Sequence, residues 1–133
     1  MQLDMKKIVI CIFVASLLAS CAKWQRVGVT TNDVSYEVDE NSIRRQGERV
    51  IFRSRVQYPT RHFPKNGLPP HTQVTSLWAV DCQSGLYRLL STELTDSVGN
   101  VVEKKMLNDK TQWQNPPEQG SAMFRQHQKV CLQ

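Results

Sequence analysis

The feature that most restricts the fold of this chain is the alternation of side chains between Arg49 and Tyr58. Successive side chains of a β-strand point to opposite faces, so a period of two predicts a strand with one buried face. One predicted face carries mostly apolar or small side chains, and the other carries most of the charge. The two sets are Val50, Phe52, Ser54, Val56 and Tyr58, and Arg49, Ile51, Arg53, Arg55 and Gln57.

Shorter runs of the same kind predict further strands on both sides of this one. We expect residues 33–39 to pair with Arg49–Tyr58 as an antiparallel hairpin, and the later strands, joined by short turns with glycine, to form a meander. The other predicted strands are 23–29, 72–82, 86–95 and 101–106. Four prolines and a glycine between Pro59 and His71 predict a loop.

The end of the chain predicts one helix. Two prolines and a glycine lie between Asn115 and Gly120, and Ser121 is a suitable N-cap for the residues after it. A helix over 121–129 would partly cover the sheet with Met123, Phe124, His127 and Val130. The expected fold class is therefore α+β: an antiparallel β-sheet of about five to six strands with a C-terminal helix.

The start of the chain predicts a secretory signal. Two lysines precede an apolar run, Ile8 to Leu18, which is shorter than the roughly 20 residues that span a bilayer. The run ends in Leu18-Ala19-Ser20-Cys21, which resembles the lipobox of bacterial lipoproteins. That resemblance implies cleavage before Cys21, lipid on its thiol and, because Ala22 comes next, anchoring in the outer membrane. The alternatives are an ordinary signal peptide or a buried helix that happens to contain Leu-Ala-Ser-Cys.

These assignments divide the chain into a lipoprotein signal peptide (1–20), a lipidated N-terminus with a linker or first strand (21–32) and a domain (33–133). The whole chain has a net charge of +5. The signal removes two positive charges and one negative charge, which leaves +4. Such a charge is too small to indicate a nucleic-acid partner by itself, and export makes that partner class less suitable still.

The cysteines predict one disulfide. Cys11 is removed with the signal and Cys21 takes the lipid, which leaves Cys82 and Cys131 in an oxidising compartment. A metal pair or a redox couple is the alternative, but there is no Cys-x-x-Cys and no histidine at ligand spacing. A bridge between Cys82 and Cys131 would tie the C-terminal helix to the sheet.

The order of these features resembles that of the surface-adhesin protein E-like lipoproteins. The matching residues are Trp24, Tyr36, Asp39, Ser42-Ile43, Trp78 to Cys82, Tyr87 to Leu90, Trp113, Pro117, Gly120-Ser121 and Cys131. The resemblance implies an antiparallel sheet with a C-terminal helix held by a disulfide. It also implies binding to host matrix or plasma proteins.

Enzymatic activity is not expected, because the sequence has no catalytic motif and no cysteine left as a nucleophile. No cofactor is expected. His62 and His71 bracket the predicted loop, but two isolated loop histidines are usually solvated, and we expect no metal site. Glu37 and Asp39 share one strand face and are expected to be solvated, opposite Arg53 and Arg55.

A basic stretch remains as the candidate binding patch, since arginine suits carboxylates, sulfates and phosphates. Its members are Arg44, Arg45, Arg49, Arg53, Arg55, Arg61 and Lys65. The alternative is charge pairing across strands. Two functions are compatible with the patch: a surface binding module, such as an adhesin for host matrix or plasma proteins or acidic glycans, or a periplasm-facing structural or envelope-maintenance lipoprotein. The sequence leaves the partner and the oligomeric state open.

Overall fold

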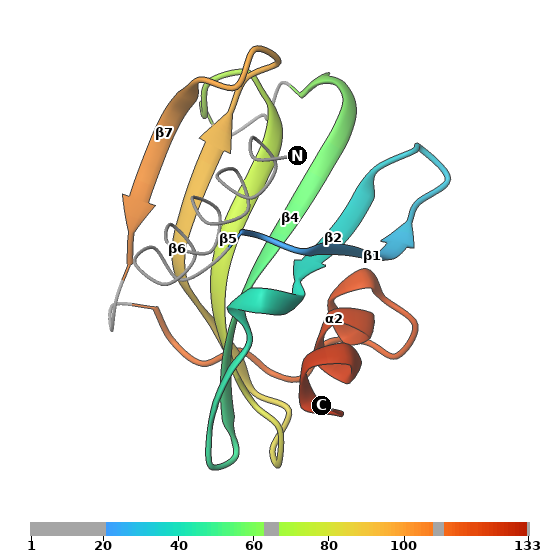
Figure 1. Cartoon of the computed structure of the whole chain (residues 1–133), viewed down its shortest axis with the longest axis vertical. Helices are drawn as coiled ribbons and strands as arrows, with labels where there is room; N and C mark the ends of the chain where they lie inside the picture. The colour runs from blue at the N-terminus through green and yellow to red at the C-terminus, as the bar shows by residue number, and fades with distance from the viewer. Residues whose placement is uncertain (1–20, 63–66, 108–110, 133) are drawn as a thin grey trace, which may run out of the picture.

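The computed structural model describes residues 21–62, 67–107 and 111–132. The predicted signal over 1–20 and Lys65 of the predicted patch lie outside them. The described residues form one antiparallel sheet of seven strands, a short 3-10 helix and one α-helix (Figure 1). The elements are β1 (Trp24–Val29), β2 (Ser35–Asp39), η1 (Glu40–Ser42), β3 (Arg44–Gln46), β4 (Arg49–His62), β5 (His71–Asp81), β6 (Tyr87–Thr95), β7 (Val101–Met106) and α2 (Ala122–Cys131).

The order of the sheet is β1-β2-β4-β5-β6-β7, and β3 pairs with the first residues of β4. β4 therefore pairs with three strands: β2, β3 and β5. The predicted hairpin of 33–39 with 49–58 is confirmed as the β2–β4 pair, and the predicted meander is confirmed as β4 to β7. The predicted number of strands was slightly low, because the three-residue β3 carries no alternation that could be recognised.

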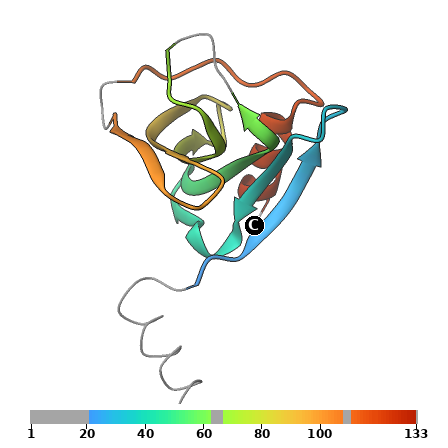
Figure 2. The same ribbon diagram turned by 90° about the horizontal axis from the view of Figure 1, so that it is seen from above.

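The alternation in β4 divides the sheet into two faces, as predicted. Val50 and Phe52 are fully buried on the face against which α2 packs. Figure 2 shows α2 lying inside the curve of the sheet, against β1, β2 and β4. We call this side the helix face. Its core consists of Val38, Val50, Phe52, Val80 and Val130.

The prediction of a loop from Pro59 to His71 is wrong at both of its limits, because both ends belong to strands. β4 continues through Pro59 to His62, and His62 pairs with His71 at the start of β5. The register is irregular between Gln57 and His62, and β2 ends its pairing at Gln57. Pro59 therefore lies where the strand has a neighbour on one side only, and its missing N–H costs little there.

Helix α2 begins as predicted, with the Ser121 hydroxyl accepting a hydrogen bond from the backbone N–H of Phe124 at 3.2 Å. It ends at Cys131, two residues later than expected. The predicted disulfide is confirmed: Cys131 is bonded to Cys82, which directly follows β5. Of the predicted covering residues, His127 and Val130 are buried, whereas Met123 and Phe124 are half-buried and the unexpected Gln126 is buried.

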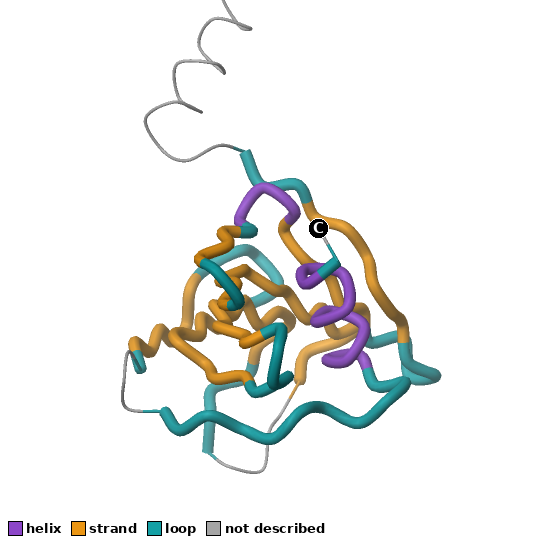
Figure 3. Tube along the Cα trace, turned by 90° about the horizontal axis from the view of Figure 1, so that it is seen from below, coloured by secondary structure: helices purple, strands orange, loops and turns teal. Residues whose placement is uncertain are grey.

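The chain reaches α2 through residues 111–121, an irregular segment that runs back past the sheet (Figure 3). Tyr87 and Gln114 exchange two backbone hydrogen bonds, of 3.2 and 2.7 Å, and so fix this segment to the first residue of β6. Within the described ranges, no helix has the length and apolar character needed to cross a bilayer.

Candidate functional site

The sheet face opposite α2 carries most of the predicted basic patch. Arg49, Arg53 and Arg55 of β4 point to it, since Val50, Phe52 and Ser54 point to the helix face. Arginines from β3, β4 and β6 lie there beside two tryptophans. We call this surface the arginine face and define it as Trp24, Arg44, Arg49, Arg53, Arg55, Arg88 and Trp113.

At one end of the arginine face, two guanidinium groups lie over the ring of Trp24. The guanidinium carbon of Arg55 is 4.2 Å from the ring centroid and that of Arg53 is 5.4 Å away. Cations within about 6 Å of an indole centroid are attracted by the negative face of the ring. Trp24 of the edge strand β1 is therefore attracted to Arg53 and Arg55 of β4 by cation–π interactions, in addition to the backbone pairing that joins the two strands through β2.

The same two arginines face carboxylates of β2. Arg55 donates from Nε and Nη2 to the two oxygens of Glu37 at 3.2 and 2.8 Å, and Gln57 also donates to Glu37. Arg53 lies 3.8 Å from Asp39 as an ion pair. The positions of Glu37 and Asp39 opposite the two arginines were predicted, but their predicted exposure was wrong: both are buried.

Glu37 is held in its charged form by these contacts. Burial acts to raise the pKa of the Glu37 carboxyl, but the hydrogen bonds from Arg55 and Gln57 and the Arg55 charge outweigh it, so the pKa is lowered from its ordinary value. The Arg55 side chain is 20% exposed and that of Glu37 is 11% exposed, so water weakens this pair only partly. The positive charge at the Trp24 end is thus already balanced inside the protein.

The other end of the arginine face is more open. Arg49 and Arg88 lie against Trp113, with guanidinium carbons 5.2 and 5.0 Å from the ring centroid. They border a cavity of 90 Å³, the size of a small ionic group. Its lining residues are Arg44, Gln46, Arg49, Ile51, Ala79, Arg88, Leu90 and Trp113. Among the described residues, no carboxylate lies within 4 Å of the Arg44 or Arg49 guanidinium.

Asp81 is near the Trp113 end of the arginine face but does not form an ion pair with Arg49. It is the register partner of Arg49 in the β4–β5 pair. Its Oδ1 atom instead accepts hydrogen bonds from the backbone N–H groups of Gln83 and Ser84, at 2.9 and 3.1 Å. The Ser84 bond is the main reason that the pKa of the Asp81 carboxyl is lowered; the charge of Arg49 contributes least.

Beside Arg53, the same face is hollowed above β4 to β7. The hollow has a volume of 390 Å³ and is lined by neutral polar, charged and apolar side chains. Its lining residues are Arg53, Thr75, Ser76, Leu77, Ser91, Thr92, Glu93, Lys104 and Met106. Glu93 and Lys104 are register partners, so the charges on its β6–β7 side are balanced.

Not all of the predicted patch lies on this face. Arg45 points to the helix side, where its Nη2 donates to the carbonyl oxygen of Cys131 at 2.9 Å, at the C-terminal end of α2. The side chain of Arg61 and the whole of Lys65 lie outside the described part of the chain. The patch was predicted without Arg88 and without any role for Trp113, because neither is near Arg49 in sequence.

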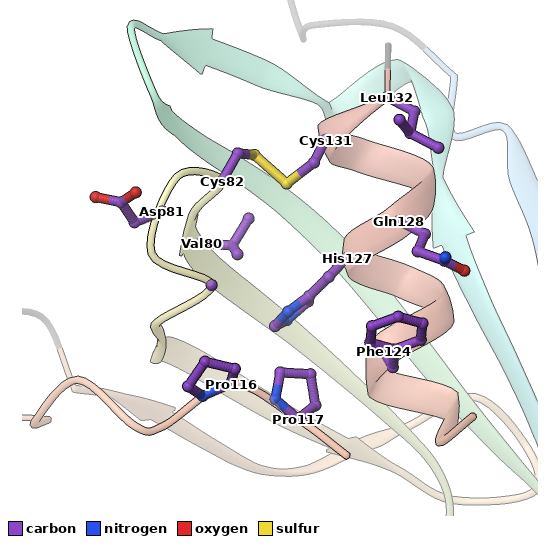
Figure 4. Close-up of a pocket in the computed structure, with 11 residues that line it drawn as sticks. Val80, Asp81, Cys82, Pro116, Pro117, Phe124, His127, Gln128, Cys131 and Leu132 are labelled. Atoms are coloured by element: carbon purple, nitrogen blue, oxygen red, sulfur yellow. A yellow bond between two sulfur atoms is a disulfide. The ribbon is translucent and has the colours of Figure 1, made fainter. Parts of the chain in front are cut away.

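The helix face has a cavity of its own, of 280 Å³, between α2, the end of β5 and Pro116-Pro117 (Figure 4). Its lining is mainly apolar, and His127 points toward the two prolines. Burial lowers the pKa of His127 to about 4, so its ring is neutral at pH 7. The ring packs edge-on against Phe52 and Tyr87, at centroid distances of 6.4 and 4.9 Å.

The other described histidine side chain is also structural. His71 was expected to be solvated in a loop, but it is buried as the first residue of β5. Its Nδ1 lies 2.8 Å from the carbonyl oxygen of Pro69, and its ring packs edge-on against Tyr58. Over the ranges that the structure describes, no group of three or more His, Cys, Asp or Glu side chains could hold a metal ion.

Comparison with protein families matches residues 24–132 to the model of the surface-adhesin protein E family. No match is found among curated proteins. Among solved structures, protein E of Haemophilus influenzae is similar, with a TM-score of 0.57 and 15% identity over 82% of this chain and 83% of that one. A second crystal form of protein E has a TM-score of 0.54 and 13% identity, over 85% and 97% of the two chains. At such identities the solved structures establish the fold alone.

Proposed function

This chain belongs to the surface-adhesin protein E family, and we propose that it is a lipid-anchored surface binding module whose arginine face binds an acidic partner. The family name supports an adhesin-like role at the surface. The lipobox ending at Cys21 supports the anchor, with lipid on the thiol of this residue and the outer membrane as its location. The partner is an acidic matrix or plasma protein, or an acidic glycan.

The observation that carries this proposal is the unequal distribution of charge over the arginine face. At the Trp24 end, Arg53 and Arg55 are matched by Asp39 and Glu37. At the Trp113 end, Arg44 and Arg49 face a cavity without a carboxylate partner among the described residues. Guanidinium groups beside an apolar ring bind carboxylate, sulfate or phosphate groups through paired hydrogen bonds. The Trp113 end is therefore the part of the face that we assign to the partner.

Binding to immobilised heparin, a polysulfated probe, tests the assignment. The salt concentration that elutes the mature protein should fall for Arg49→Glu, because a guanidinium that faces the cavity is replaced by a repelling carboxylate. Trp113→Ala should also lower it by removing the wall on which the arginines lie. Arg125→Glu is the matched control, since it makes the same charge change at an exposed position of α2 on the other face.

Equal losses for Arg49→Glu and Arg125→Glu would show that net charge alone governs binding. A wild-type protein that fails to bind heparin, matrix proteins or plasma proteins at physiological salt would refute the binding role. Resistance of the protein to protease on intact cells would then favour the alternative, a periplasm-facing structural lipoprotein. Labelled palmitate that enters Cys21→Ala as well as wild type would refute the anchor.

A further inference from the structure

The segment that begins at Cys21 is part of the fold from its first residue. The carbonyl oxygen of Cys21 accepts a hydrogen bond from the side-chain amide of Asn41 at 2.7 Å. The backbone N–H of Lys23 donates to Asp39 at 2.8 Å, and its carbonyl oxygen accepts from the N–H of Glu40 at 2.9 Å. β1 begins one residue later. No linker separates Cys21 from the domain.

This has a geometric consequence. An extended chain gains roughly 3.3–3.6 Å per residue, so a lipoprotein needs many free residues to hold its domain away from the bilayer. Here the residue that carries the lipid is itself bonded to η1. Figures 2 and 3 both show the described chain starting at the corner made by η1 and the start of β1. Whatever lies at this corner must face the membrane surface at close range.

The corner is basic. Lys23 and Lys129 lie 3.2 and 2.9 Å from Glu40, one on each of its carboxylate oxygens. Arg45 binds the carbonyl oxygen of Cys131 beside them, and Arg44 donates to the carbonyl oxygen of Asn41 at 2.9 Å. Lys23, Lys129 and Arg45 thus lie at this corner, with Glu40 and the buried Asp39 as its carboxylates. Lys23 is 66% exposed, so its charge is available to the surface.

The corner also has an apolar projection. Leu132 caps α2 directly after the disulfide and is 83% exposed. In Figure 4 it points toward the N-terminal segment of the described chain. Basic side chains that surround an exposed apolar one match the interfacial region of a bilayer, where phosphates lie beside the first methylene groups. A lipid surface satisfies both features at once.

We propose that this corner rests directly on the bilayer, with Lys23, Arg45 and Lys129 on the phosphates of anionic lipids and Leu132 inserted beside them. The proposal rests on the lipid anchor at Cys21 that is part of the proposed function. It adds that the domain is oriented by the membrane and does not move freely on a tether. Each basic residue at an anionic surface contributes roughly a fivefold gain in affinity.

The test uses the acylated full-length product in vesicles and a membrane-impermeant reagent that labels amines, with each lysine read by mass spectrometry. In vesicles that contain phosphatidylglycerol, labelling of Lys23 and Lys129 should fall at least fivefold relative to the protein in neutral detergent. Lys104 and Lys105 are exposed on β7, at the opposite edge of the sheet, and should label equally in both. They are the internal control.

Charge reversal separates the causes. Lys23→Glu with Arg45→Glu should restore labelling of Lys129, whereas Lys104→Glu with Lys105→Glu should leave Lys23 and Lys129 protected. Protection that is equal in phosphatidylcholine vesicles would overturn the assignment to anionic headgroups. Full labelling of Lys23 on a chain whose Cys21 peptide carries acyl chains would overturn the orientation while the anchor stands. A Cys21 peptide without acyl chains would refute the anchor itself.

Discussion

The two faces of β4 use neighbouring residues of one strand for different purposes. On the helix face, Val50 and Phe52 are fully buried and lie under a helix that a disulfide holds in place. On the arginine face, Arg49 and Arg53 are exposed, and the contacts that hold them are electrostatic. Apolar burial and covalent bonds contribute far more stability than exposed charges do. The helix face therefore supplies most of the stability of this domain, and the arginine face supplies little of it.

Removing the disulfide should have the largest effect. Cys82→Ala with Cys131→Ala removes a covalent bond between residues separated by 49 positions. The chain-entropy model gives about 4 kcal/mol for the stabilisation that is lost. The melting temperature should then fall by on the order of 15 °C. Calorimetry of the mature domain checks this, and reduction of the wild type should give a similar loss. A loss below about 1 kcal/mol would mean that apolar packing alone holds α2.

The second-largest effect should be a loss of stability in acid, caused by His127 on the helix face. His127 has a folded pKa of about 4 against an unfolded value near 6.5, so protons favour the unfolded chain. Its contribution is complete above pH 6.5 and is lost as the pH falls toward 4, about 3 kcal/mol in all. Urea unfolding at a series of pH values measures the slope. His127→Phe should flatten it, and an unchanged slope would assign the pH dependence to other groups.

The Trp24 end of the arginine face should show an intermediate effect. Glu37→Gln keeps the shape of the side chain but leaves the half-buried Arg55 without its counter-charge, which should cost roughly 1–2 kcal/mol. Glu93→Gln is the control on the same face, where less than about 0.5 kcal/mol is expected. Chemical denaturation gives both values. The wild-type contribution of Glu37 should be present at neutral pH and disappear below about pH 4, as the carboxylate with a lowered pKa is protonated.

Substitutions at the Trp113 end of the arginine face should have almost no effect on the free energy of unfolding. Arg49→Ala should change the free energy of unfolding by less than about 0.5 kcal/mol, because the side chain is exposed and has no carboxylate within 4 Å among the described residues. The same denaturation experiment measures it. A loss as large as that of Glu37→Gln would show that the two ends of the face are equally structural, and the division between stability and binding would fail.

The parts of this fold that obey local rules could be predicted from the sequence. The faces of β4 follow from alternation, the Ser121 cap from its place before a helical run, and the disulfide from the removal of the other two cysteines. Pro59 inside a strand could not be predicted, because its tolerance depends on β2 ending at Gln57, which is a long-range fact. The partial neutralisation of the predicted patch could not be predicted either, since Glu37 and Asp39 lie in β2, which pairs with β1 on one side and with β4 on the other.

The segment that carries the chain from β7 to α2 has a further consequence through the disulfide. Cys82 and Cys131 close a covalent ring that includes β6, β7, residues 107–121 and α2. A protease that cuts once within this ring, at an exposed position such as Val98, divides the chain without releasing either piece. Both fragments stay joined by the sulfur bridge, so the fragment with Cys21 keeps the other attached to it. A protein built this way tolerates a single proteolytic nick without losing a part.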